Sequence, residues 1–173
     1  MPESIAQEII FCNFCDILSN MNYWLIKSEA SCYSIDDLKR DKKTAWTGVR
    51  NYQARNFMQD MQVGDRVLFY HSNGTPENPT GIYGIAQVTA LAHVDATQFD
   101  ISDDHYDPKS SPEKPIWYCV DIGFVKKLTQ PITLTELKRD PKTANMMVCQ
   151  QGSRLSVLPV SEKHFTYIES CIS

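Results

Sequence analysis

The chain has 173 residues, enough for one well-filled hydrophobic core and short for two independent domains. Its hydrophobic fraction of 42% and charged fraction of 22% are typical of a soluble globular protein, and no apolar run approaches the length of a membrane span. The 17 Lys and Arg against 21 Asp and Glu, a formal net charge of -4, argue against a protein that coats polyanions through a broad basic face. A local basic pocket stays compatible with this charge.

Residues 1–20 are expected to be an extension that precedes a single domain at 21–170. The apolar middle of the extension is interrupted by Asn13 and Asp16, and no Lys or Arg precedes it, so it fails as a secretory signal. A short docking helix is the expected form if the segment is ordered. Met21 stands directly before the first predicted strand, which suggests that the extension comes from an upstream start.

Six cysteines are scattered without the spacing of a disulfide framework: Cys12, Cys15, Cys32, Cys119, Cys149 and Cys171. Without an export signal they are expected to stay reduced, which predicts a cytoplasmic protein, or a nuclear one if the source is eukaryotic. The tetrapeptide CNFC has the spacing of half a zinc site or of a redox pair, but no second clustered pair follows it. We therefore expect no metal and no cofactor.

The first half of the chain predicts two strands with two helices between them. Aromatic and apolar residues gather at 22–28 and again at 66–72, as in strands. Ser34, with Asp37 three residues later, forms a variant capping box at the start of a short helix. Apolar residues then recur over 51–61 at i, i+3, i+4 and i+7, the spacing of one buried helical stripe. The opposite face of that helix must carry the polar groups.

The second half predicts more strands and short helices. A long strand is expected at 82–94, with Gly84 marking a bulge or sharp bend. The acidic, Pro-rich stretch 95–115 is long for a structureless connection and is therefore either functional or mobile. The remaining elements are a strand at 116–128, short helices at 133–140 and 142–148 separated by Pro141, a short strand at 154–160, and a closing helix at 161–169 capped by Ser161. Strands separated by short helices without regular alternation predict an α+β fold with a mostly antiparallel, strongly bent sheet.

The stretch WTGVRNYQARNFM at 46–58 concentrates aromatic, cationic and amide side chains. Arg50 lies at the expected helix entrance, where free backbone N–H groups and the positive dipole end favour an anion. With Arg55 it would offer two guanidinium forks for one phosphate. Trp46 and Tyr52 would wall a cavity sized for one heterocycle, on which a base could stack. The alternative is an ordinary solvated helix face with Trp46 in the core.

Polar side chains also occur at the ends of the first two predicted strands. Because side chains alternate between faces, Ser28 and Lys27 project to opposite sides. Tyr70 and Ser72 likewise share the face opposite His71, so this histidine cannot activate Ser72 as in a Ser-His hydrolase. No histidines have metal-ligand spacing and no Gly-rich phosphate loop is present in the sequence. The residues assemble no convincing catalytic centre.

Eight blocks of the sequence occur in an order that is typical of one known family: NYWLIKSEA, SIDDL, WTGVRNYQARNFM, VGDRVLFYHSN, GIYGIAQV, TQFD, ITLTELK and RLSVLPV. In these blocks the chain resembles the EVE domain, the fold of the thymocyte nuclear protein family and its bacterial relatives. The resemblance runs from about Met21 to Ile168 and leaves residues 1–20 outside.

The resemblance implies a PUA-like fold, a bent, barrel-like, mostly antiparallel sheet flanked by short helices and related to the YTH readers of methylated RNA. It further implies a non-catalytic reader of a modified base, with modified cytosine in DNA preferred to RNA as partner. We also expect a monomer that has no role at a membrane. By residue match, the base pocket should draw on Trp24, Lys27, Ser28, Trp46, Val49, Arg50, Asn51, Tyr52, Arg55, Tyr70, His71, Ser72 and Asn73. Family members commonly carry Pro where this chain has Ala30, which loosens the backbone after the first strand.

An acidic protein can bind nucleic acid through one cupped site, in which a few cations hold phosphates while aromatic walls contact a single extruded base. Stacking contributes about 1–3 kcal/mol per base, and extrusion costs about as much, so the pocket must add hydrogen bonds. A methyl group adds roughly 0.8 kcal/mol. Two alternatives stay open: an enzyme or accessory factor that acts on modified nucleotides or RNA through Lys27, His71 or Asp121, and a protein that binds a small molecule.

Overall fold

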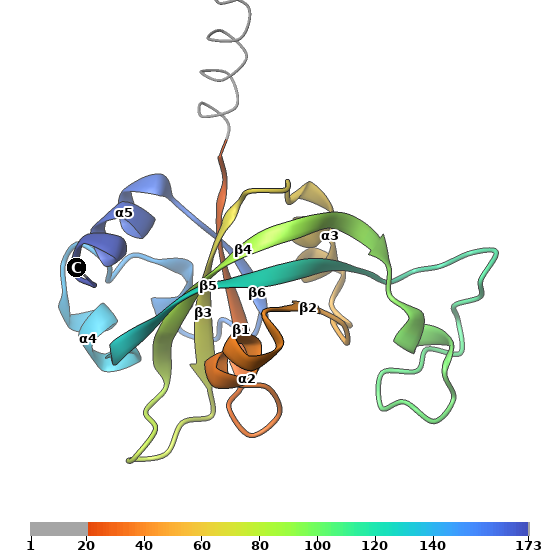
Figure 1. Ribbon diagram of the computed structural model, residues 1–173, viewed down its shortest axis with the longest axis horizontal. Coiled ribbons are helices and arrows are strands. Elements are labelled where there is room, and N and C mark those ends of the chain that lie inside the picture. The colour runs from red at the N-terminus through yellow and green to blue at the C-terminus, as the bar shows by residue number, and fades with distance from the viewer. Residues whose placement is uncertain (1–20, 173) are drawn as a thin grey trace, which may run out of the picture.

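Six strands form one mixed sheet in the computed structural model, which describes residues 21–172 (Figure 1). The strands, in chain order, are β1 (Tyr23–Glu29), β2 (Lys43–Ala45), β3 (Arg66–Ser72), β4 (Gly81–Val94), β5 (Tyr118–Thr133) and β6 (Val157–Val160). Their order across the sheet is β2-β5-β4-β3-β1-β6. Only the β1–β3 pair is parallel among these strands, which confirms an α+β fold with a mostly antiparallel sheet. The sheet keeps two edges, β2 and β6, and is not closed into a barrel.

Short helices lie on both faces of this sheet. They are α2 (Ile35–Asp41), α3 (Tyr52–Asp60), η1 (Ala96–Phe99), α4 (Leu134–Arg139), η2 (Met147–Cys149) and α5 (Glu162–Ser170), where η marks a 3-10 helix. The predicted capping box of α2 is confirmed, because Ser34 Oγ accepts from the Asp37 N–H and the Asp37 carboxylate accepts from the Ser34 N–H. Ser161 caps α5, as predicted. Within residues 21–172, every helix is too short or too polar to cross a membrane.

Alternation along the strands gives the sheet one apolar core on each face. On one face, which we call the α2/α3 face, Ile26 and Phe69 pack with Ile35 of α2 and Met58 of α3. On the other, the α4/α5 face, Leu25 and Tyr70 pack with Leu137 of α4 and Phe165 of α5. Figure 1 places α4 and α5 at one end of the sheet and the long β4–β5 connection at the other.

Several predicted boundaries are wrong. No α-helix forms at 142–148, because Asp140 closes turns there through its carbonyl, which accepts from the Thr143 and Ala144 N–H groups. β5 runs past the predicted end at 128, and β6 is shorter than the predicted strand at 154–160. The short edge strand β2 was missed, since its stability comes from pairing with β5 and not from an apolar pattern of its own.

The predicted bend at Gly84 is confirmed. The pairing of β4 with β5 shifts register beside this residue, and a Cβ there would lie 2.5 Å from Ile35 Cδ1. Glycine is therefore required where α2 crosses β4. Residues 1–20, with the predicted docking helix and the CNFC motif, lie outside the described residues.

The acidic connection between β4 and β5 has defined internal structure. Gln98 of η1 is fully buried, and its amide donates to the carbonyls of Asp95 and Trp117 while accepting from the N–H groups of Ile116 and Trp117. One buried amide thus satisfies backbone groups at both ends of the segment, which we call the acidic loop (95–117).

Candidate nucleic-acid interface

Strand alternation divides the predicted base-binding residues between the two faces of the sheet. In the parallel β1–β3 pair, Lys27 lies beside Tyr70 and Ser28 beside His71. Lys27 and Tyr70 face the α4/α5 side, whereas His71 contacts α2. Ser28, one residue from Lys27, projects to the side of His71. The predicted set therefore does not gather around one cavity.

A cavity of about 480 Å³ opens at the ends of β1 and β3 on the α4/α5 face. Four residues of the predicted set line it: Lys27, Tyr70, Ser72 and Asn73. The other walls come from the β3–β4 loop, α4 and the segment after η2: Gly74, Thr80, Leu134, Lys138, Val148, Gln150, Gln151, Gly152, Ser153 and Arg154. Pockets for small ligands measure roughly 300–1,000 Å³, so one nucleobase is well within its capacity.

Lys27 and Tyr70 form the inner part of this cavity. The Lys27 Nζ donates to the Ser153 carbonyl at 3.1 Å and lies 6.0 Å from the centroid of the Tyr70 ring. Burial lowers the pKa of Lys27 and raises the pKa of Tyr70 to about 12, so the phenol is neutral at physiological pH. Since an ammonium carries three donors, Lys27 keeps N–H groups for an acceptor in the cavity.

Backbone geometry shapes the rim. Asn73 adopts a φ of 52°, and its amide donates to Glu29 Oε1 at 2.6 Å, which ties the β3–β4 loop to the end of β1. A Cβ on Gly74 would lie 2.2 Å from the Thr80 nitrogen, so the loop closes only with glycine there. These contacts hold Asn73 at the mouth of the cavity.

The sequence did not reveal the wall at 150–154. Its residues, Gln-Gln-Gly-Ser-Arg, precede β6, and Gly152 adopts a φ of +78°. A polar run with a glycine before a predicted strand was the available signal. Nothing in that local pattern indicates that the run faces Lys27, because this contact joins residues far apart in the chain.

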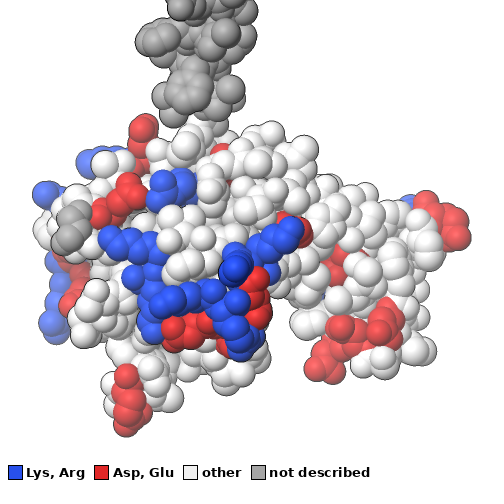
Figure 2. Space-filling model, viewed as in Figure 1, with Lys and Arg blue, Asp and Glu red and all other residues white. Residues whose placement is uncertain are grey.

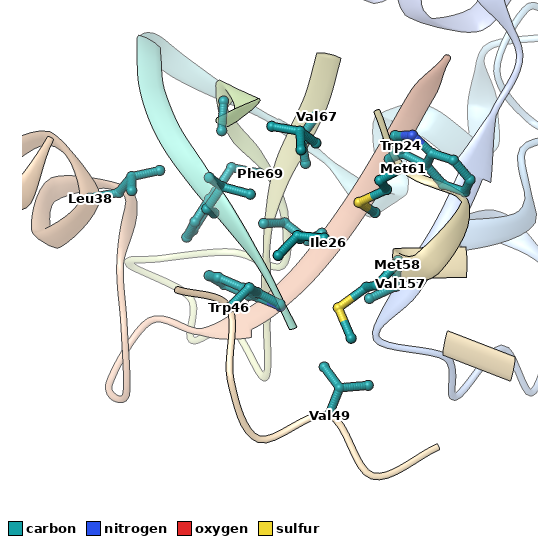
Figure 3. Close-up of a cluster of buried hydrophobic side chains, with 14 of the residues drawn as sticks. Trp24, Ile26, Leu38, Trp46, Val49, Met58, Met61, Val67, Phe69 and Val157 are labelled. Atoms are coloured by element: carbon teal, nitrogen blue, oxygen red, sulfur yellow. The ribbon is translucent and has the colours of Figure 1, made fainter. Parts of the chain in front are cut away.

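The two rings that were predicted to wall one cavity lie in different environments. Trp46 is 9% exposed, and its indole packs edge-on against Phe69 at 5.6 Å between centroids, close to Ile26 and Val49 (Figure 3). Tyr52, by contrast, is 57% exposed. Trp46 and Val49 are core residues, as in the alternative with a buried indole, and the prediction that Trp46 and Tyr52 face each other across one cavity is wrong.

Trp24 is also structural. Its ring is buried, and its Nε1 donates to Asp65 Oδ2 at 2.8 Å. The same buried carboxylate accepts from the backbone N–H groups of Asn22 and Gln62, so it joins the start of β1 to the turn before β3. The indole has no donor left for a ligand.

Arg50 anchors the acidic loop. All three guanidinium nitrogens donate to protein oxygens, with Nε reaching the His105 carbonyl at 2.6 Å, one terminal nitrogen Asp95 Oδ2 at 2.9 Å and the other Thr97 Oγ1 at 2.8 Å. Burial by itself raises the pKa of Asp95, but hydrogen bonds from Arg50, Thr97 and the Gly48 N–H outweigh it and hold the pKa below its usual value. This internal carboxylate takes the place of the phosphate that the sequence predicted for Arg50.

Tyr52 and Arg55 form the exposed part of the motif. The Tyr52 ring packs on Trp117 at 4.9 Å, and the Arg55 guanidinium lies 4.9 Å from the Tyr52 centroid. Arg55 also donates to the Ile116 carbonyl, so it holds the far end of the acidic loop. Asn51 is the N-cap of α3 and accepts from the second and third N–H groups of the helix. Its side-chain carbonyl oxygen is therefore used for capping.

His71 holds α2 in place. Its Nε2 accepts from the Ile35 N–H at 3.1 Å, and its ring stacks on Tyr83 at 4.0 Å. Burial lowers the pKa of His71, which keeps the imidazole neutral and able to accept. His71 therefore lies away from Lys27, on the other face, and Asp121 of β5 contacts His93. The three residues of the enzyme alternative do not converge on one site.

Another constellation resembles a catalytic triad without its geometry. Cys119 Sγ lies 3.5 Å from His93 Nδ1 and 3.7 Å from Nε2, and Nε2 lies 2.9 Å from Asp121 Oδ1. A sulfur nearly equidistant from both nitrogens is in line with neither. Burial, followed by the nearby Asp95 and Asp121, raises the pKa of Cys119 to about 12. Within residues 21–172, no group of three or more His, Cys, Asp or Glu is placed to hold a metal ion.

The sequence matches known proteins over most of its length. Residues 22–171 match the family model described as the EVE domain. Mouse thymocyte nuclear protein 1 is 40% identical over 167 residues, which cover 86% of this chain and 73% of that protein. An uncharacterized protein of Schizosaccharomyces pombe is 32% identical over 161 residues.

Solved structures share the same architecture. A hypothetical protein from Leishmania major superposes with a TM-score of 0.83 at 45% identity, covering 88% of this chain and 95% of the other. The human THYN1 protein, solved in complex with 5-methylcytosine-containing DNA, superposes with a TM-score of 0.80 at 36% identity, covering 88% of this chain and 98% of the other. The family match and these identities establish that the chain belongs to the EVE domain family.

Proposed function

We propose that this protein is a non-catalytic reader that binds one modified base in a nucleic acid, with modified cytosine in DNA as its ligand class. The observation that carries the proposal is the relation to human THYN1, a protein solved with 5-methylcytosine-containing DNA, at 36% identity over 88% of this chain. The protein acts as a monomer, without a cofactor. Its relatives are named nuclear proteins, so in a eukaryotic cell we expect it in the nucleus, with its DNA partner.

The base enters the cavity at the ends of β1 and β3 in this proposal. The partly exposed Leu134, with the edges of the buried Tyr70 and Val148 side chains, offers apolar surface for a ring and its methyl group. Side-chain amides of Gln150 and Gln151 line the same cavity, and amides supply both donors and acceptors for a base edge. This mixture of apolar wall and polar rim is what a base pocket requires.

A base can reach such a cavity only after it leaves the duplex stack. Extrusion costs a few kcal/mol, roughly what stacking on one aromatic ring returns, at about 1–3 kcal/mol per base. Hydrogen bonds to the base edge must therefore make binding favourable, and a methyl group against Val148 would add roughly 0.8 kcal/mol. We infer that selectivity comes from this last contribution.

Three cations support phosphate binding at the same place. Lys27, Lys138 and Arg154 line the cavity, and Lys138 and Arg154 are exposed at its mouth. Among the described residues, neither exposed cation forms an ion pair with a carboxylate. A phosphate beside the extruded base would meet them first.

The remaining predicted residues have supporting roles in this proposal. Ser28 contacts the nucleic acid outside the cavity, whereas Tyr52 and Arg55 pack on Trp117 and Ile116 of the acidic loop. The residues that hold the surrounding elements are Trp24, Trp46, Val49, Arg50, Asn51 and His71.

The test is a titration of two oligonucleotides that differ only by 5-methylation of one cytosine, at one stated salt concentration. The wild type should bind the methylated strand more tightly. Val148→Ala should reduce this preference, whereas Gln151→Ala and Lys138→Ala should weaken binding of both oligonucleotides equally. Lys163→Ala, an exposed lysine of α5, is the matched control and should change neither. Equal binding of both oligonucleotides by the wild type would refute the proposal.

Two further readouts separate the alternatives. Free 5-methylcytidine that displaces the oligonucleotide completely at stoichiometric concentration would favour a small-molecule site. Conversion of a modified nucleoside to product would favour an enzyme. Neither result is expected, because the phosphate contacts add affinity only for the polymer and no histidine or carboxylate is among the residues that line the cavity.

A further inference from the structure

We propose that a second surface, on the other face of the sheet from the cavity, binds the phosphate backbone that flanks the captured base. This inference rests on the proposed function. The surface, which we call the basic ridge, consists of Lys39 and Arg40 of α2, Lys42, Lys43 of β2 and Lys127 of β5, all exposed. Figure 2 shows Lys and Arg side chains gathered over α2 and the neighbouring strands.

Exposed carboxylates occupy only part of the ridge. Lys127 pairs with Asp36 at 2.7 Å, and Arg40 pairs with Asp37 and Asp41 at 2.7 and 2.8 Å. Such exposed pairs contribute little to stability and exchange readily for a phosphate. Three other cations, Lys39, Lys42 and Lys43, form no ion pair with a carboxylate in the part of the chain that the structure describes.

Lys42 occupies a backbone position that favours glycine. Its φ is 66° and its ψ is -38°, a conformation that residues with a side chain rarely adopt. The Lys42 carbonyl accepts from the Phe124 N–H at 2.8 Å, and glycine would keep this contact. The lysine side chain therefore adds charge to the ridge at the expense of backbone strain.

The helix that carries Lys39 and Arg40 begins at the end of β3. The first N–H of α2, that of Ile35, donates to His71, and His71 stands in sequence between the cavity residues Tyr70 and Ser72. One strand end thus carries the cavity on one face and the ridge helix on the other. The proposal requires that the flanking phosphates of a duplex that delivers one base to the cavity pass around this strand end to the ridge.

The opposite end of the molecule repels a polyanion. The acidic loop carries Asp100, Asp103, Asp104, Asp107 and Glu113 against Lys109 and Lys114. Figure 2 shows Asp and Glu gathered where this loop extends from the sheet. The electrostatic field of the acidic loop and the ridge together orients a duplex with its phosphates toward the ridge. This orientation is possible although the net charge of the whole chain is negative.

The experiment measures oligonucleotide affinity as a function of salt for Lys39→Glu/Lys43→Glu. The slope of log K against log salt should fall by about 0.9 for each phosphate that the variant no longer neutralises, equally for methylated and plain duplexes. The ratio of the two affinities should stay unchanged. The control, Lys109→Glu/Lys163→Glu, makes the same charge change away from the ridge and should keep the wild-type slope.

Lys42→Gly separates charge from folding. Its thermal stability should equal or exceed that of the wild type, because glycine relieves the backbone strain, yet its salt slope should fall by about 0.9. A stable variant with an unchanged slope would show that Lys42 contacts no phosphate.

The outcomes distinguish the two proposals. If the ridge and control variants have the same slope of log K against log salt, the ridge does not bind phosphates. The proposed reader function is then unaffected. Loss of the affinity ratio at unchanged slope also overturns the ridge. A wild type that binds methylated and plain duplexes equally overturns the reader function, and the slopes still decide the ridge. No binding of either duplex overturns both.

Discussion

Arg50 and Lys27 both lie in motifs that the sequence assigned to the base pocket, but their surroundings differ. All three guanidinium nitrogens of Arg50 donate hydrogen bonds to protein acceptors, which include the fully buried carboxylate of Asp95. Lys27 has one protein acceptor, the Ser153 carbonyl, and no ion pair among the described residues. A cation is available to a ligand only when the fold leaves its donors unused.

The two aromatic rings of the motif differ in the same way. Trp46 is enclosed by Phe69 and the other side chains of the α2/α3 core, whereas Tyr52 rests on Trp117 with most of its surface in solvent. Four predictions follow from these contrasts, in descending order of their effect on stability.

Trp46→Ala should lower the free energy of unfolding by about 3–5 kcal/mol, the range for loss of a large buried ring. Tyr52→Ala should lower it by less than about 1 kcal/mol, because the ring is 57% exposed. Urea denaturation of both variants measures the difference. If both variants lost a similar free energy of unfolding, the two rings would be equally buried, and the contrast between Trp46 and Tyr52 would be wrong.

Asp95→Ala should lower the free energy of unfolding by about 2–3 kcal/mol. It leaves Arg50 without its carboxylate, and the loss stays below that of a fully buried pair because the Arg50 side chain is 20% exposed. Asp104→Ala in the same loop removes an exposed carboxylate and should change stability by no more than about 0.5 kcal/mol. Equal effects would show that the acidic loop does not depend on this pair.

His71 should make stability depend on pH. The stabilisation that neutral His71 gives the fold is present in full above the ordinary histidine pKa of 6.5. It is lost as pH falls toward the lowered pKa of the folded state, because protonation removes the acceptor for the Ile35 N–H. The slope for one such group cannot exceed about 1.4 kcal/mol per pH unit.

A second histidine requires a control in this experiment. Burial also lowers the pKa of His164, so both histidines destabilise the fold in the same direction as pH falls. Denaturation of His164→Gln and of His71→Gln/His164→Gln between pH 7 and 5 isolates the His71 contribution. If both variants show the same pH dependence, His71 is not held neutral by the fold.

Arg154→Ala should leave stability within about 0.5 kcal/mol of the wild type, because the side chain is exposed and unpaired within the described chain. Its affinity for oligonucleotides should nevertheless fall, measured by fluorescence anisotropy at fixed salt. If Arg154→Ala lowered stability without lowering affinity, Arg154 would have a structural role, as Arg50 does. The contrast between Arg50 and the cations of the cavity would then fail.

Local patterns in the sequence were enough to predict much of the fold. The capping box at Ser34 involves groups three residues apart, and the apolar stripe of α3 repeats within two turns, so neither depends on distant segments. Strand alternation likewise predicted that His71 faces away from Ser72. The edge strand β2 escaped prediction because its only support is pairing with β5, far along the chain.

The sequence by itself determined the capped helices and the cores of the long strands, which of their side chains share a face, and, through its family blocks, the class of ligand to expect. The tertiary structure alone decided which of those side chains remain free to bind one. Arg50 and Asp95 are 45 residues apart in the sequence, and Lys27 and Ser153 are 126 residues apart. No local sequence pattern predicts either hydrogen bond. Burial and pairing depend on which segments the fold brings together, and these set the availability of each charge.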